Sequence, residues 1–465
     1  MPDQLESDYL VVGAGTAGMA FTDSLLTHSD ATVTIVDRRH GPGGHWLDAY
    51  PFVRLHQPSA FYGVASVALG ADEIDRSGIN EGFYELAGAD ELRAYYARVM
   101  RQQFLPSGRV RYFPCADYMG GDSGTHTFRS RLTGQTHHVR VKRRLVDTGY
   151  LEGKVPATSP PSFAVAEGIR CIPAGDVTRL EHGGRYAIIG AGKTALDTCV
   201  WLLLQGVQPG RIRWIKSRES WWLNRRYHQP NSFLPDFCAG VAMQLQAMAQ
   251  APSVAEVFAR LEQDGFLLRV DPGVVPSMMR GAILSEKELM LLRQVEDVVR
   301  LGHVRRIEPD RIVLDDGEVE AAADTVYVHC AAYGLSRPPL RPIFEQDRVT
   351  LQPCFWGFAS FQFALLGVVE SLVETAEEKN RLCLPLQYWD APQDYLSAYL
   401  ALLRSERVRA AHPLIANWAK ETRLNPLGQV GRFRDDPAMA RAFAAIRQFA
   451  GPAGDNIKRL LQATA

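Results

Sequence analysis

Two glycine-rich segments, each placed between an apolar run and a stretch with helical spacing, are the parts of this chain best suited to chemistry. The first spans residues 13–18, Gly-Ala-Gly-Thr-Ala-Gly, and the second spans residues 190–195, Gly-Ala-Gly-Lys-Thr-Ala. A turn of this kind between a strand and a helix lets backbone N–H groups at the helix N-terminus hold a pyrophosphate. Two such turns predict two bound dinucleotides and electron transfer between them.

In the first turn the three glycines have different tasks. Gly13 permits the sharp turn, Gly15 lets the backbone approach a pyrophosphate, and Gly18 lets the helix pack on the strand. The next strand ends at Asp37, about 20 residues later, where a carboxylate binds ribose hydroxyls and would repel a 2′-phosphate. We therefore expect FAD or NAD(H) rather than NADP(H) at this turn, with Arg38 as a further cofactor contact.

The second turn is followed by cations where the first is followed by a carboxylate. Its next strand ends at Lys216-Ser217-Arg218, and Lys216 and Arg218 suit a 2′-phosphate, which favours NADPH. The alternative is that both side chains belong to an ordinary solvated loop. Within the turn, Lys193 can add charge near the pyrophosphate. The expected contacts from the turn are Gly190, Gly192, Lys193 and Thr194.

Length and composition narrow the class of protein. The chain has 465 residues, enough for two or three domains, with 46% apolar residues, 22% charged residues and a formal net charge of −1. Without a basic excess, we expect neither nucleic acid nor a membrane surface as a partner. We see no signal peptide, no apolar run of the roughly 20 residues that a membrane span needs, and no Cys-x-x-Cys among seven cysteines. These features favour a cytoplasmic protein, and its oligomeric state is not readable from the sequence.

The order of elements predicts an α/β fold with two Rossmann-like dinucleotide-binding domains. We expect residues 1–152 and 331–385 to form an FAD-binding domain that contains an inserted NAD(P)H-binding domain, residues 153–330. A helical insertion over residues 236–300 and a helical C-terminal extension over residues 386–465 complete the chain. A bare two-dinucleotide scaffold lacks these helical segments, so we expect them to cover the substrate cleft.

Further motifs resemble the flavin-containing monooxygenases and the Baeyer–Villiger monooxygenases, over roughly residues 8–230 and 303–375. The motifs are Gly43-Gly44-His45-Trp46, the segment from Tyr50 to Ser59, Thr148-Gly149 after a meander of short strands, and Arg218 followed by Trp221 and Trp222. The resemblance implies that Gly44, Trp46 and Gly149 contact FAD and that Arg218 holds the NADPH phosphate. Trp46 can alternatively fill the core.

Three departures from that family pattern bear on the reaction. The Phe-x-Gly-x-x-x-His segment keeps only Gly168, the late Thr-Gly-Tyr corresponds to residues 331–333, and His56 stands where Baeyer–Villiger enzymes have aspartate. A histidine beside a flavin can donate to the ring or shuttle a proton near neutral pH, or it can simply bond to backbone. We select His56, Gln57 and Arg54 as catalytic candidates. Gln57 would bond the polar edge of the ring, and Arg54 would balance the reduced flavin.

The expected function is an FAD-dependent, NADPH-using oxidoreductase. The resemblance implies a monooxygenase that acts on a small organic substrate through reduced flavin and molecular oxygen. One alternative is a flavin oxidase or dehydrogenase without a stable peroxyflavin. Another is a non-catalytic FAD-binding sensor or structural flavoprotein. We expect no metal site, because His137 and His138 lack other ligands at suitable spacing.

Overall fold

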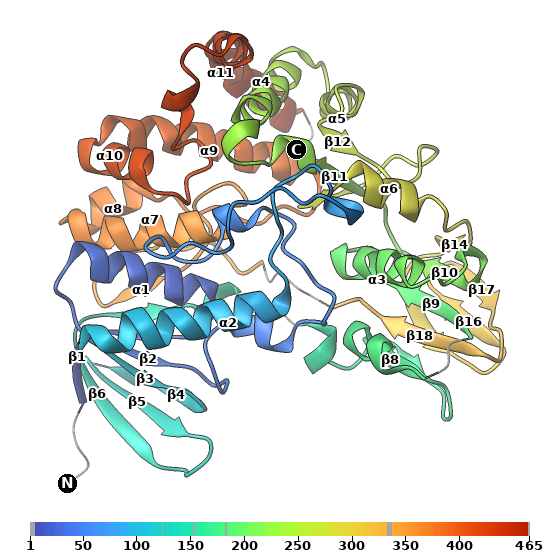
Figure 1. The fold of residues 1–465 in the computed structure, drawn as a ribbon, viewed down its shortest axis with the longest axis horizontal. Coiled ribbons are helices and arrows are strands. Elements are labelled where there is room, and N and C mark those ends of the chain that lie inside the picture. The colour runs from blue at the N-terminus through green and yellow to red at the C-terminus, as the bar shows by residue number, and fades with distance from the viewer. Residues whose placement is uncertain are drawn as a thin grey trace.

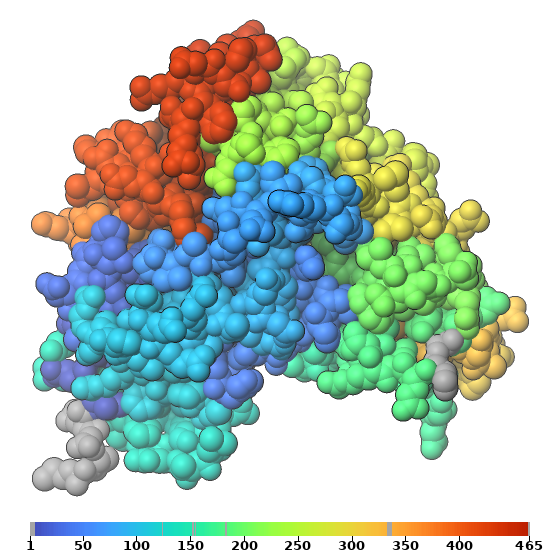
Figure 2. All heavy atoms as spheres, in the orientation of Figure 1, coloured from blue at the N-terminus to red at the C-terminus, as the bar shows by residue number. Residues whose placement is uncertain are grey.

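The computed structural model describes residues 5–463 apart from 123, 152, 154, 182–183 and 333–336, so Tyr333 of the late motif lies outside the described residues. Two largely parallel β-sheets lie side by side, and a group of helices lies across one side of both (Figure 1). In the space-filling view the two units form two lobes that meet beneath these helices (Figure 2). The predicted α/β class with two Rossmann-like units is confirmed.

The first unit is built on a seven-stranded sheet, which combines six strands from residues 5–147 with one strand from residues 348–350. Its strands are β1 (Leu5–Val12), β2 (Val33–Val36), β3 (Val110–Phe113), β4 (Ala116–Asp122), β5 (Thr125–Ser130), β6 (Thr136–Asp147) and β19 (Arg348–Thr350). Strands β3, β2, β1 and β6 run parallel, and β19 pairs with the end of β6. Strands β5 and β4 extend the sheet antiparallel, which confirms the predicted meander.

Four helices accompany this sheet. They are α1 (Thr16–His28), α2 (Ala89–Val99), α7 (Ala359–Leu372) and α8 (Ala376–Leu382). Helix α1 begins directly after the first glycine turn, with Gly15 as its N-cap. Helix α7 crosses α1 so closely that a Cβ on Gly367 would lie 2.5 Å from the carbonyl oxygen of Phe21. The return of the chain after residue 331 therefore packs on the first unit.

The second unit has a five-stranded parallel sheet in the order β14-β10-β9-β18-β8. The strands are β8 (Cys171–Pro173), β9 (Arg185–Ile189), β10 (Ile212–Ile215), β14 (Val298–Val299) and β18 (Thr325–His329), and α3 (Lys193–Leu204) follows the second glycine turn. A four-stranded sheet adjoins it, built from β7 (Ala164–Val165), β15 (Val304–Ile307), β16 (Arg311–Leu314) and β17 (Gly317–Glu320).

The segment 236–300 is less helical than expected. It contains α4 (Leu234–Gln250), α5 (Val254–Gln263) and α6 (Glu286–Leu292), and also β12 (Leu267–Leu268) and β13 (Met278–Leu284). Both strands pair with β11 (Ser220–Asn224), which precedes the segment. This pairing joins residues about 40 to 60 positions apart, so local periodicity does not reveal it. Strand β14 then returns the chain to the parallel sheet.

The C-terminal extension consists of α9 (Pro392–Ala411), α10 (Pro413–Glu421) and α11 (Pro437–Gln462). Helix α11 packs along α4 (Figure 1), and the Asn456 side-chain amide donates to the carbonyl oxygens of Met248 and Ala251, both at 2.8 Å. The insertion and the extension thus form one helical body. Among the described helices, none combines the length and apolarity required to cross a bilayer.

Candidate functional site

A cavity of about 680 Å³ opens at the carboxyl end of β1, beside the first glycine turn. Ligand pockets for small molecules and cofactors usually measure about 300–1,000 Å³. Residues predicted for the first site that line the cavity are Gly13, Gly15, Asp37, Arg38, Gly44, Trp46, His56, Gln57 and Gly149. They come from positions up to 136 apart in the chain, between residues 13 and 149, and the fold brings them together at one sheet edge.

The backbone of the first turn needs glycine for close approach. Gly13 has φ of +110°, and a Cβ there would overlap the Thr148 hydroxyl. A Cβ on Gly18 would overlap the carbonyl oxygen of Gly13, so helix and strand pack as predicted. Gly44, with φ of +59°, lies against Gly15: a Cβ on Gly44 would be 2.8 Å from the Gly15 Cα. The floor beneath a bound pyrophosphate is therefore made of glycine backbone.

Asp37 is buried at the end of β2, with 5% of its surface exposed, and it lines the cavity. Its carboxylate accepts hydrogen bonds from the amides of Ala14 (2.6 Å) and Arg39 (2.7 Å). Since a carboxylate offers about four acceptor positions, it retains acceptor capacity for ribose hydroxyls. Asp37 thus fixes the glycine turn and can bind a ribose with the same two oxygens.

Trp46 belongs to a hydrogen-bond chain that sequence reasoning missed. Its indole N–H donates to the Tyr62 hydroxyl (2.9 Å), and that hydroxyl lies 2.8 Å from Thr16 Oγ1. The Tyr96 hydroxyl also donates to Thr16 Oγ1, at 2.9 Å. Trp46, Tyr62 and Thr16 all line the cavity. Thr16 lies in the glycine turn and Trp46 in a family motif, whereas nothing in the sequence pointed to Tyr62 and Tyr96.

The three catalytic candidates occupy different environments. His56 lines the cavity, and its buried Nδ1 atom has no hydrogen-bond partner among the described residues. Burial, aided by the positive charges of Lys193 and Arg225, lowers the pKa of His56 to about 3. The imidazole is therefore neutral at pH 7 in this environment, and its expected roles beside a flavin stay predictions. Gln57 also lines the cavity and donates to the carbonyl oxygen of Gly357 at 2.9 Å.

Arg54 does not fit its expected role. Its side chain is exposed, its backbone forms an isolated β-bridge with Gly88, and it is not among the residues that line the cavity. An exposed guanidinium outside the cavity is screened by water and cannot neutralise a buried flavin. The assignment of Arg54 as the counter-charge is therefore wrong.

The second turn has the same backbone design. Gly190 has φ of +146°, and a Cβ there would lie 3.2 Å from the Cys330 Cβ. Apart from the adjoining residues and the helix backbone, no described atom lies within 4 Å of the position that a Cβ on Gly192 would occupy, so the N-terminus of α3 is open. Thr194 lies half-buried in the first turn of α3.

Lys193, expected near the pyrophosphate, is instead paired with carboxylates. Its Nζ forms ion pairs with Asp197 and, at 3.3 Å, with Glu288. Glu288 also pairs with Arg225 at 2.6 Å, and both side chains are at most 4% exposed. A buried charge needs such partners, because leaving water is costly. Lys193 therefore stabilises the contact between the second turn and the insertion.

The two cations expected to bind a 2′-phosphate are also paired. Lys216 is 3% exposed, lies 2.7 Å from Glu219 and packs over the Trp214 ring, so it is not a loop cation facing a ligand. Arg218 donates to Asp390 at 2.7 Å, and Arg280 donates to the same carboxylate at 2.6 Å. The Arg218 side chain is 37% exposed and stays accessible. Of the two predicted residues, Arg218 alone keeps the geometry for a phosphate contact.

Comparisons with known proteins bear on the first turn and on the family of the chain. Residues 11–58 match the model of an NAD(P)-binding Rossmann-like domain, which covers the first turn and Asp37. The chain is 42% identical over 467 aligned positions to the uncharacterized proteins Rv2000 of Mycobacterium tuberculosis and Mb2023 of Mycobacterium bovis. The alignment covers 99% of this chain and 85% of each relative. The chain belongs to their family.

Among solved structures, three that resemble this chain have low sequence identity to it. An open form of cyclohexanone monooxygenase is 14% identical (71% of this chain, 74% of that one, TM-score 0.45). A variant flavin monooxygenase of Stenotrophomonas maltophilia is 15% identical (75% and 86%, TM-score 0.43). Tmm of Pelagibacter sp. strain HTCC7211 is 9% identical (88% and 90%, TM-score 0.48).

Proposed function

We propose that this protein is an FAD-dependent, NADPH-using oxidoreductase that oxygenates a small organic substrate. The observation that carries the proposal is the cavity of about 680 Å³ at the first glycine turn, with Asp37 buried at its ribose end. A Rossmann turn with a strand-end carboxylate selects a dinucleotide without a 2′-phosphate. FAD satisfies that requirement, and its flavin half would occupy the same cavity, which Trp46 and His56 line.

The residues around the cavity fit FAD. The N-terminus of α1 offers amides and a helix dipole to the pyrophosphate, and the glycine floor of Gly15 and Gly44 leaves room for it. Asp37 takes the ribose. When bound, the flavin supplies hydride acceptance from a nicotinamide and electron transfer to oxygen.

The chain's own groups then position and shield the reaction. Leu55, Phe363 and Tyr388 line the cavity and exclude water. His56, kept neutral by burial and by nearby cations, offers Nδ1 as a hydrogen-bond partner rather than as a proton carrier. For NADPH, the open N-terminus of α3 would take the pyrophosphate and Arg218 the 2′-phosphate.

A second candidate is a flavin oxidase or dehydrogenase that takes its electrons from the substrate. Its supporting observation is that Lys193, Lys216 and Arg218 are all paired with carboxylates, which weakens the attraction for NADPH. The same observation supports, more weakly, a flavoprotein without turnover.

Anaerobic mixing of the FAD-loaded protein with NADPH, without organic substrate, separates these functions. The proposed enzyme loses the oxidised flavin absorbance, and NADH acts more slowly. An oxidase or dehydrogenase stays oxidised with both nucleotides until its own substrate is added. The variant Gly192→Val is the control, because it blocks the second turn and leaves the first turn intact.

A further inference from the structure

We propose that Arg423, in the C-terminal extension, is a positioning residue for the flavin cavity. It fixes the loop of residues 59–69, whose Tyr62 holds two cavity residues. This inference rests on the proposed flavin site, and it gives the C-terminal extension a task besides covering the protein.

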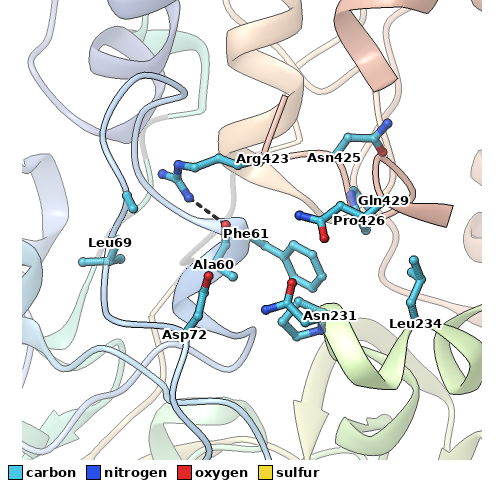
Figure 3. Close-up of a pocket in the computed structure, with 12 residues that line it drawn as sticks. Ala60, Phe61, Leu69, Asp72, Asn231, Leu234, Arg423, Asn425, Pro426 and Gln429 are labelled. Carbon is cyan, nitrogen blue, oxygen red and sulfur yellow. Dashed lines mark hydrogen bonds between the residues drawn. The ribbon is translucent and has the colours of Figure 1, made fainter. Parts of the chain in front are cut away.

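The Arg423 guanidinium binds four carbonyl oxygens of this one loop. Nη1 donates to Ala60 at 2.7 Å, and Nη2 donates to Tyr62 at 2.8 Å, Val64 at 2.6 Å and Val67 at 2.8 Å. Figure 3 shows the guanidinium reaching across a small pocket toward Ala60, with Asn425, Pro426 and Gln429 on the side of the extension. Nη2 carries two N–H groups, so its three acceptors share them, and Nε has no hydrogen-bond partner among the described residues. The planar fork of a guanidinium can reach such spread acceptors, whereas the ammonium of a lysine is a single point.

The loop is also held from the first unit. Asp23 of α1 accepts hydrogen bonds from the backbone and side chain of Ser66. The Tyr95 hydroxyl accepts from the Val64 amide and donates to the Val67 carbonyl, both at 2.7 Å. Arg423 also interacts with Tyr95 and Asp23 themselves. The bonds from Tyr95 and Asp23 to Val64, Ser66 and Val67 remain without the arginine, so its loss should displace and loosen the loop rather than unfold the unit.

Tyr62 connects the loop to the cavity. Its carbonyl oxygen is bound by Arg423, and its hydroxyl lies at hydrogen-bond distance from Thr16 in the first turn and from Trp46 in the cavity wall. The Tyr62 ring is buried with 7% exposure, so it has little freedom to compensate for a backbone shift. A movement of the carbonyl is therefore carried to the hydroxyl and to both cavity residues.

An exposed arginine on the same extension provides a control for the loss of arginine–carbonyl contacts. Arg459 of α11 donates to the carbonyl oxygens of Ala251 (3.4 Å) and Pro252 (3.3 Å). It docks the extension on the loop after α4 and is not among the residues that line the cavity. Arg423→Met and Arg459→Met thus both remove arginine–carbonyl contacts, but only Arg423→Met removes contacts to the loop of residues 59–69.

The test measures FAD affinity of the full chain and amide hydrogen exchange of the loop. We expect Arg423→Met to weaken FAD binding at least about tenfold and to speed exchange at the Val64 and Ser66 amides. Arg459→Met lowers the thermal midpoint and changes neither quantity. Arg423→Lys restores part of the affinity. Tyr62→Phe weakens FAD binding too, and in combination with Arg423→Met the two losses are not additive, since they act through one connection.

Unchanged FAD affinity in Arg423→Met, or equal losses in Arg423→Met and Arg459→Met, overturns the proposal. If Arg423→Met does not fold, Arg423→Lys and Tyr62→Phe carry the same test. If the unaltered protein binds no FAD, the proposed function fails. In that case amide hydrogen exchange alone tests the role of Arg423. If exchange at the Val64 and Ser66 amides is the same in Arg423→Met as in the unaltered protein, the inference is overturned.

Discussion

The two glycine turns of this chain share a backbone design and differ in their surroundings. At the first turn, a buried carboxylate supports the backbone and a cavity of about 680 Å³ opens beside it. At the second turn, the N-terminus of α3 is open, yet the three predicted cations are each paired with a carboxylate. The partner of Lys193 lies one helical turn on, that of Lys216 three residues on in the same loop, and that of Arg218 in the C-terminal extension. A motif therefore predicts the strand, turn and helix, while residues outside the motif determine how strongly each turn attracts an anion.

We expect the largest effects on cofactor binding from substitutions that add a side chain at one of the two glycine turns. Gly15 and Gly192 both have extended backbone, which valine also adopts. A Cβ on Gly15 would lie 3.4 Å from the Gly44 Cα, so a circular dichroism spectrum must first show that Gly15→Val folds. Gly15→Val places methyl groups on the floor of the cavity and should weaken FAD binding at least about a hundredfold. Gly192→Val should leave FAD bound and abolish reduction by NADPH. Fluorescence titration with FAD and anaerobic reduction check the pair, and equal FAD affinities in the two variants would contradict the assignment.

A smaller effect is expected at the ribose carboxylate. Asp37→Asn removes the charge that the buried amides and a ribose share, and hydrogen bonds to charged groups contribute about 1.5–3 kcal/mol. FAD binding should therefore weaken by about tenfold to a hundredfold. The exposed Asp122 on β4 serves as control, and Asp122→Asn should bind FAD as the unaltered protein does. An Asp37→Asn protein with undiminished FAD affinity would show that the ribose lies elsewhere.

At the second turn, removing a competing carboxylate should strengthen binding. Asp390 accepts from Arg218 and Arg280, and although burial opposes its ionisation, these hydrogen bonds lower the pKa of Asp390 to about 2. Asp390→Asn frees both arginines for a 2′-phosphate. Partly exposed ion pairs contribute about 0–1 kcal/mol, so NADPH affinity should rise by no more than about fivefold. NADH affinity should stay constant. A rise for NADH as large as for NADPH would place Arg218 away from the phosphate.

The smallest effect concerns pH. Burial lowers the pKa of His228, whose ring packs against Phe237 and Phe266, to about 4, whereas an unfolded histidine has a pKa of about 6.5. Between these values the unfolded chain binds the extra proton, so the free energy of unfolding falls as pH falls, by up to about 1.4 kcal/mol per pH unit. His228→Gln should reduce this acid dependence by the share of one histidine, whatever constant change in the free energy of unfolding the lost packing causes near pH 8. Denaturant unfolding at a series of pH values measures it. A dependence that is unchanged in the variant contradicts the burial argument.

Some of this organisation was predictable from the sequence because it is local. The two apolar runs of the first unit, the first glycine turn and Asp37 lie within about 30 residues, and the fold places them together as expected. The pairing of Lys193 with Asp197 was also readable, since residues four apart share a helix face.

Other features depend on residues far apart in sequence. Glu288 reaches Lys193, Asp390 reaches Arg218, and Arg423 reaches Tyr62 across 361 positions. No spacing rule connects such positions, because tertiary packing alone brings them together. Arg54 shows the converse: its place in a motif suggested a role that its exposure does not permit.

A crystal structure of the full chain grown with FAD tests the central claim most directly. We expect the pyrophosphate at the N-terminus of α1, the ribose hydroxyls on Asp37, and the flavin ring between Trp46 and His56. FAD bound at the second turn beside Arg218, or a first cavity left empty at saturating FAD, would contradict it.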